Sequence, residues 1–264
     1  MGMKVALSLI MFALGAVMGS FLACQAWRLH YKDTGKGSLG KRSVCLSCKK
    51  QLKWFDNIPI ISWLMLRGRC RYCKKKIGLM EILAEVLMGL AFFGLTWMLY
   101  PAGTEALSYV ILGLVFLLVT VMGFLAIYDG KWGELPSFAL IIALVLAAVI
   151  CGLKIWLVGF SWLMLGDLLG GVAILGGTYL ILYLVSHGEW VGDGDWILGV
   201  IIGLVLGRAW LALIVLCLSN CLGLIVMYPA ARKKKQKKIY FGPFLVVAFV
   251  ITLMFAEFFN GLIF

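Results

Sequence analysis

Two acidic residues of this 264-residue chain stand where an apolar segment meets a short polar loop. Asp195 closes the string GDGD at residues 192–195, and Asp129 ends an apolar run and begins the loop 129–136. Two carboxylates that share one proton can catalyse hydrolysis by acid–base chemistry, because one activates water while the other protonates the carbonyl or the amine. Asp129 and Asp195 are therefore candidates for a catalytic pair.

Simpler roles for the same aspartates stay open at this point. Asp195 could cap the helix that follows it, and Asp129 could begin a turn, so spacing alone favours neither the catalytic nor the capping role. Asp193 is a second candidate for the catalytic position. It ranks below Asp195 because it lies between two glycines and points from a loop.

Four cysteines form two Cys-x-x-Cys pairs with 21 residues between them: Cys45, Cys48, Cys70 and Cys73. Each pair can place two thiolates on one tight turn, and four thiolates close a tetrahedral shell around Zn²⁺. A closed shell indicates a structural zinc site rather than a catalytic one. Two disulfides are the alternative, which a reducing cytoplasm disfavours.

The apolar segments that flank these residues must lie in a membrane. Hydrophobic residues make up 63% of the chain and the mean hydropathy is +1.04, which a water-soluble globule cannot bury. We predict an all-α polytopic membrane protein with about eight transmembrane helices and a small cytoplasmic zinc-binding module. The expected spans are 5–27, 79–100, 105–128, 137–158, 165–185, 197–207, 209–229 and 243–263.

The positive charges predict how the chain crosses the membrane. The formal net charge is +12, with 14 of the 24 Lys and Arg between Arg28 and Lys76 and six more in 232–238. Because these clusters flank apolar spans, they indicate cytoplasmic loops of an inner-membrane protein, in contact with lipid head groups. Nucleic-acid binding is not expected, since the motifs of such proteins are missing.

The count of spans depends on the segment 197–229. As one helix its 33 residues would be about 50 Å long, well beyond a hydrocarbon core of about 30 Å, and Gly207-Arg208 interrupts it. With two short helices there, the loops that hold Asp129, Asp195 and both basic clusters all lie on the cytoplasmic side. The expected parts are a first transmembrane helix (1–27), a cytoplasmic four-cysteine zinc module (28–78) and a transmembrane core that carries both aspartates (79–264).

Several motifs in order resemble one known family, the type IV prepilin peptidases, which are leader peptidases and N-methyltransferases. The resemblance covers nearly the whole chain. It is carried by Gly19 to Leu22, Arg28-Leu29, the two cysteine pairs, Trp54 to Trp63, Leu66 to Cys73, Ile77 to Glu81, Asp129 to Pro136, Gly192 to Asp195 and Ile239 to Phe244.

The resemblance implies a substrate and two reactions. The substrates would be prepilins or pseudopilins of type IV pilus and type II secretion systems, with a short basic leader, a glycine and an apolar helix. Asp129 and Asp195 would cut after the glycine at the cytoplasmic membrane face. The new N-terminal amine would then be methylated from S-adenosylmethionine, with Glu81 as the candidate cofactor-binding residue.

Three positions depart from the family pattern. Ala23 stands where the family usually has Asn, Ser137 where Asp is frequent, and Ile197 where Lys is common. These departures are the basis of an alternative, a non-catalytic membrane assembly factor that keeps the fold. A transporter that uses its intramembrane acids as ion ligands is a third interpretation, which the order of the motifs disfavours.

Overall fold

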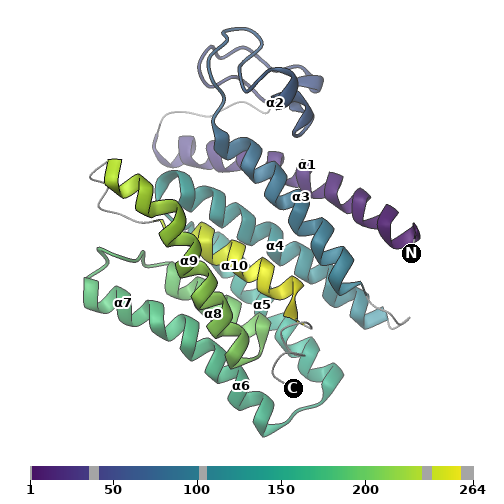
Figure 1. The fold of residues 1–264 in the computed structure, drawn as a ribbon, viewed down its shortest axis with the longest axis vertical. Helices are drawn as coiled ribbons and strands as arrows, with labels where there is room; N and C mark the ends of the chain where they lie inside the picture. Colours follow the sequence, from purple (N-terminus) through teal and green to yellow (C-terminus); the bar gives the residue numbers. More distant parts are fainter. Residues whose placement is uncertain (1, 36–41, 101–105, 234–239, 257–264) are drawn as a thin grey trace. The chain divides into compact units, whose positions relative to one another are not determined.

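The structure, a computed structural model, describes residues 2–35, 42–100, 106–233 and 240–256. Within those residues it contains helices and turns but no β-strand, only two isolated bridges (Figure 1). The basic side chains of 232–238 and the end of the last expected span, 257–263, lie outside the described part. The all-α prediction is confirmed.

Six helical segments are long and apolar enough to cross a membrane, and two shorter apolar helices accompany them. Together they match the eight expected spans, so the polytopic architecture is confirmed. The long segments are α1 (Gly2–Asp33), α3 (Leu79–Leu99), α4 (Ala106–Trp132), α5 (Ser137–Val158), the continuous helix Trp162–Ser186 and α9 (Ala209–Lys233). The short ones are α8 (Asp195–Leu206) and α10 (Gly242–Met254).

The break between α8 and α9 falls where the sequence predicted it. Gly207 ends α8 in a left-handed conformation with φ of +65°, which favours glycine. With 12 residues, α8 is about 18 Å long and too short to cross a full hydrocarbon core. Asp195 is therefore carried on a half-length helix.

The helix Trp162–Ser186 contains a feature that the sequence did not indicate. Its segments α6 (Trp162–Val172) and α7 (Thr178–Ser186) are joined by a π-helical turn, η2 (Ala173–Gly177). η2 and the end of α6 both pack closely on α8, where Gly199 lies against the backbone of Leu175 and Gly203 against that of Gly171. A Cβ atom at either glycine would lie 2.8 Å from that backbone, so small residues here bring the two helices together.

The chain forms two compact units, Met1–Trp97 and Met98–Phe264. The first contains α1, α3 and the polar segment between them, which holds the short helices η1 (Trp54–Asn57) and α2 (Ile61–Met65). In this unit Gly15 and Gly19 of α1 leave no room for a Cβ beside the backbones of Met88 and Ala84 of α3. The two spans therefore meet through a small-xxx-small contact.

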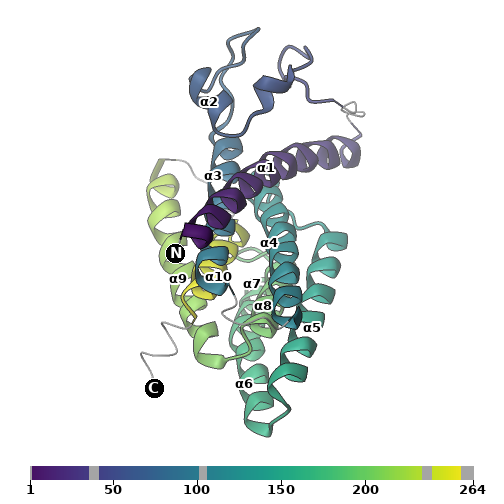
Figure 2. The same cartoon turned by 90° about the vertical axis from the view of Figure 1, so that its right-hand side faces the viewer.

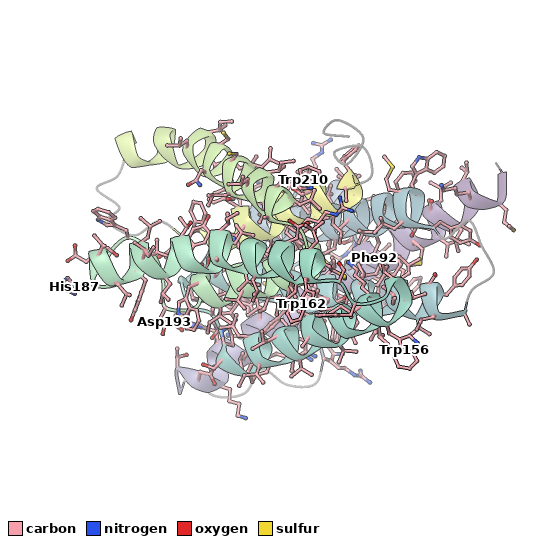
Figure 3. All side chains as sticks on the ribbon, turned by 90° about the horizontal axis from the view of Figure 1, so that it is seen from below. Phe92, Trp156, Trp162, His187, Asp193 and Trp210 are labelled. Atoms are coloured by element: carbon pink, nitrogen blue, oxygen red, sulfur yellow. The ribbon has the colours of Figure 1, made fainter. Side chains whose placement is uncertain are left out.

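In the second unit, α10 lies beside α4 and α9 in both ribbon views (Figures 1 and 2). α5 leads away from the end of α4, and Trp162–Ser186 returns, so the end of α4 and the start of α8 lie at the same end of the unit. His187 and Asp193 mark this end, and Trp156 lies at the other (Figure 3). Exposed Trp156, Phe160 and Trp162 at the far turn are typical of an aromatic belt at a membrane interface.

Candidate active site

A solvent-open pocket lies at the polar end of the second unit. It is lined by the loop residues 188–195, by Asp129, Gly133 and Leu135 from the end of α4 and the loop after it, and by Tyr240 before α10. Both predicted catalytic aspartates and their competitor Asp193 line this pocket. Residues 66 positions apart in the sequence are thus brought to one site.

Asp129 lies in the last turn of α4 and is only 6% exposed. Its Oδ2 accepts a hydrogen bond of 3.0 Å from the backbone N–H of Gly242, the first residue of α10. The amino end of a helix carries partial positive charge, which stabilises a carboxylate there. α10 therefore fixes the carboxyl group of Asp129 from a part of the chain 113 residues away.

Asp195 is the first residue of α8 and is 3% exposed. Its Oδ2 accepts a 3.0 Å hydrogen bond from the backbone N–H of Gly192, and its buried Oδ1 has no hydrogen-bond partner. Gly194, not Asp195, occupies the N-cap position of α8. An aspartate with one oxygen held and the other unbonded is suited to hold a water molecule or a substrate atom.

Both carboxyl groups are buried and line the same pocket. Two carboxylates in one buried site cannot both ionise without cost, so such a pair favours a state with one shared proton. That state contains the base and the acid that hydrolysis of an amide requires. Asp193, by contrast, is exposed to solvent at the pocket rim.

Glycines on both sides of the pocket allow its loops to pack. A Cβ at Gly194 would lie 2.6 Å from Leu135 Cδ1, so the GDGD loop rests directly on the loop that follows α4. Gly133 has a φ of +70° and leaves no room for a Cβ beside the ring of Tyr240. The glycines of both aspartate motifs therefore have a steric role in closing the site.

Lys154 supports α8 at the end opposite to Asp195, and the sequence reasoning missed it. The Nζ atom of this α5 side chain donates a 2.7 Å hydrogen bond to the carbonyl of Val205, in the last turn of α8. A positive charge is stabilising at the carboxyl end of a helix. Because α8 is too short to cross the membrane, its last carbonyl groups lie where no water can form hydrogen bonds with them. A lysine inside an apolar span was the available signal.

We expect Lys154→Met to lower the thermal stability of the purified protein in detergent. The buried carbonyl of Val205 would lose its partner, which costs about 1–3 kcal/mol. The melting temperature measures this loss, and Leu153→Met at the adjacent position of α5 is the control. An unchanged melting temperature for Lys154→Met would show that this hydrogen bond does not stabilise α8.

The four predicted metal ligands form a separate cluster in the first unit. The sulfur atoms of Cys45, Cys48, Cys70 and Cys73 all lie within 4.8 Å of one another, and the cysteines are free rather than disulfide-bonded. Four thiolates at about 2.3 Å from one zinc ion would be about 3.8 Å apart, so a small contraction suffices for binding. The cluster can hold a metal ion.

The two cysteine pairs sit on turns of the same construction. The backbone carbonyl of Cys45 accepts a hydrogen bond of 2.8 Å from the N–H of Lys49, and the backbone N–H of Cys45 donates one of 2.9 Å to the carbonyl of Lys50. Cys70 repeats both bonds with Lys74 and Lys75, and Lys49 and Lys74 share a left-handed φ near +60°. Each turn thus presents two thiols in the same direction, as a metal-binding knuckle does.

The thiols also differ in how readily they ionise. Burial raises the pKa of Cys45, but backbone hydrogen bonds from Cys48 and Ser47 and contacts with neighbouring thiols outweigh it and lower the pKa to about 7. At Cys73 the Lys75 backbone lowers the pKa, while burial and the other three thiols raise it to about 11. Cys45 thus ionises easily, whereas ionisation of Cys73 is disfavoured by the neighbouring thiols. A bound cation would remove this penalty by stabilising all four thiolates.

The structure places Glu81 and Glu85 on α3, in the unit that does not contain the aspartate pocket. Glu81 Oε1 accepts a 3.2 Å hydrogen bond from Trp27 Nε1 of α1. Glu85 Oε2 accepts a 2.7 Å hydrogen bond from the backbone N–H of Ile60, just before α2. Both glutamates therefore join α3 to neighbouring segments, and a cofactor role for Glu81 stays a prediction.

Residues 13–99 match the family described as the bacterial peptidase A24 N-terminal domain. A prepilin leader peptidase/N-methyltransferase of Vibrio cholerae is 29% identical over 92% of this chain and 95% of its own length. One from Aeromonas hydrophila is 32% identical over 82% of this chain and 72% of its own.

A type 4 prepilin-like proteins leader peptide-processing enzyme of Escherichia coli is 30% identical over 90% of each chain. No solved structure matches. Relatives of about 30% identity that are matched over most of both chains show common descent. The chain therefore belongs to the prepilin leader peptidase/N-methyltransferase family.

Proposed function

We propose that this protein is a membrane aspartyl endopeptidase that removes the basic leader from type IV prepilin-like proteins, using Asp129 and Asp195. One observation carries the proposal: two buried carboxylates from different helices line one solvent-open pocket at the polar end of the spans. The names of the relatives supply the substrate class.

The hydrolysis requires one aspartate ionised and the other protonated. The ionised carboxylate takes a proton from a water molecule, whose oxygen attacks the scissile carbonyl, while the protonated carboxyl donates its proton to the carbonyl oxygen. The tetrahedral intermediate then collapses: one of its hydroxyl groups returns a proton to the second aspartate, the C–N bond breaks, and the new amine receives a proton from the first aspartate. Water is consumed, and the pair returns to one proton.

The position of the pocket suits a substrate that is partly embedded in lipid. The pocket opens among loops at the ends of α4 and α7, where a polar leader can stay in water while the apolar helix of the precursor remains in the bilayer. Trp190, 61% exposed in the loop that lines the pocket, offers an apolar surface at this boundary. We infer that the cut site unwinds at the level of the aspartates.

Gly242→Ala tests whether α10 positions Asp129. The added Cβ would lie 2.7 Å from Asp129 Oδ2, so the carboxyl group must move while the helix can still form. We expect leader removal to slow by up to about 100-fold, as for other displacements of about 1 Å in catalytic sites. Gly113→Ala in α4, where nothing lies within 4 Å, is the control and should keep its activity.

We further propose that the four cysteines bind one structural Zn²⁺ on the cytoplasmic side of the inner membrane. Four free thiols within 4.8 Å of one another support this choice, and the reducing cytoplasm that the basic loops predict would disfavour disulfides. The ion would join the two knuckles and stabilise a segment that has few buried apolar residues. Cys45, Cys48, Cys70 and Cys73 would hold it.

Methylation of the new N-terminus from S-adenosylmethionine is the second proposed activity, and it rests on the names of the relatives. Glu81 bonds the indole of Trp27 on α1, which suits the joining of two helices as well as contact with a cofactor. This hydrogen bond therefore does not decide between the two roles of Glu81. Mass analysis of the processed N-terminus measures methylation separately from cleavage.

Co-expression with a prepilin-like substrate tests the proposed function. We expect the substrate to lose its leader, seen as a shift on a gel, only when this chain is present. An intact leader with well-expressed, membrane-inserted protein would favour the alternative of a non-catalytic assembly factor.

A further inference from the structure

The segment between α1 and α3 has an apolar surface that its own fold leaves uncovered. Ile61, Leu64 and Met65 lie on one face of α2, at positions i, i+3 and i+4, and are 55%, 59% and 76% exposed. Trp54 of η1, which packs against α2, is 78% exposed. We name these four residues the α2 surface.

We propose that the α2 surface inserts into the head-group region of the same membrane that the chain spans, so that the cysteine module is anchored to the bilayer and not suspended above it. This goes beyond the proposed proteolysis and does not depend on it. Contiguous exposed apolar residues on a polar segment normally mark a binding surface. The next observations identify the bilayer as the occupant.

The first observation is the depth at which α2 begins. The N–H of Ile60, directly before α2, bonds Glu85, which lies six residues inside α3. Six residues along a helix correspond to about 9 Å, so α2 starts beside the second turn of a membrane-spanning helix. In that part of α3, Leu79, Leu83 and Leu87 are themselves 66%, 47% and 45% exposed, as residues facing lipid are.

The backbone at Ile60 shows that this position is held by the fold. Ile60 has a φ of +62°, a left-handed conformation that a β-branched residue adopts only at a cost. The 2.7 Å bond from its N–H to Glu85 Oε2 keeps the turn against α3. α2 is thus fixed with its amino end at the level of the interface.

The second observation is charge. Residues 42–78 contain ten Lys and Arg but a single acidic residue, Asp56, which is paired with Arg71 at 2.7 Å. Arg67 and Arg69 follow α2 directly and are exposed. Basic residues next to exposed apolar and tryptophan side chains are the pattern of segments that lie in the interface of anionic membranes.

The third observation is the connection of the segment. It continues at both ends into membrane-spanning helices, α1 and α3, so the bilayer surface is present at a very high effective concentration. A weak interfacial contact is enough under these conditions. A soluble partner would need a larger affinity to displace the lipid.

Contact quenching of tryptophan in lipid nanodiscs tests the proposal with the full chain. The nanodiscs contain anionic lipid whose acyl chains are brominated near the head group, and Trp54→Phe is compared with the unchanged protein. We expect Trp54→Phe to lower the quenched fraction of fluorescence, and Met65→Asp to lower it as well. Trp63→Phe, at a side chain that packs on Gly68 inside the module, should leave it unchanged.

Each other outcome contradicts the proposal. If Trp54→Phe leaves or raises the quenched fraction, and aqueous acrylamide quenches Trp54 in the nanodisc, the α2 surface lies in water. If bromolipid contact at Trp54 changes only when a prepilin peptide is added, the surface is a substrate contact. Leader removal by the same samples is a separate readout, so failure here leaves the proposed protease activity intact.

Discussion

Asp129→Asn and Asp195→Asn are each expected to slow leader removal by about 10²- to 10⁴-fold, the usual contribution of a general acid or base. Asparagine keeps the size of each side chain and can still accept the N–H of Gly242 or Gly192. The fold should therefore survive while the proton transfers stop. The initial rate of leader loss from a purified prepilin measures the effect.

Asp193→Asn is the matched control for both substitutions. It removes one carboxylate from the same pocket, but from an exposed position at its rim. We expect its rate to stay within a few-fold of the unchanged protein. A severe loss in Asp193→Asn with normal cleavage by Asp195→Asn would transfer the catalytic role from Asp195 to Asp193.

Cys70→Ser is expected to abolish metal binding and to unfold the cysteine module. Cys70 is 5% exposed, and without its thiol only three of the four metal ligands remain. Because binding of structural zinc is coupled to folding, the energy of the site is lost with its ligand. Elemental analysis should find about one zinc per chain in the unchanged protein and much less in Cys70→Ser.

Cys217→Ser, at an exposed cysteine of α9, is the control for this experiment and should keep its zinc. Limited proteolysis between α1 and α3 reports the folding of the module independently. Unchanged protein without any metal, or with the module equally resistant to protease in Cys70→Ser, would contradict the structural zinc site.

The sequence predicted the parts of this protein that are set by local composition. The apolar spans, the break at Gly207 and the four cysteines are each visible within a short window, because membrane insertion and metal binding select residue type and spacing directly. The order of the motifs further identified the family. Both predicted aspartates line one pocket in the structure, but their catalytic role stays a proposal.

The remaining features depend on residues far apart in the chain. The N–H that donates to Asp129 belongs to the backbone of Gly242. Because nearly every residue has a backbone N–H, the sequence does not show which one acts as the donor. The capping of α8 by Lys154 and the π-turn η2 arise from packing of whole helices. Such contacts follow from tertiary structure, which periodicity and propensity do not contain.

The central claim is that the carboxyl groups of residues 129 and 195 act on one peptide bond, and crosslinking tests it most directly. Asp129→Cys and Asp195→Cys are combined in a chain whose Cys24, Cys151, Cys217 and Cys221 are replaced by serine, and treated with a short bismethanethiosulfonate reagent. We predict that mass spectrometry finds peptides linked through positions 129 and 195. The pair Asp129→Cys and Val158→Cys, at opposite ends of the unit, should not link; absence of the 129–195 link, with both thiols reactive singly, would contradict the account.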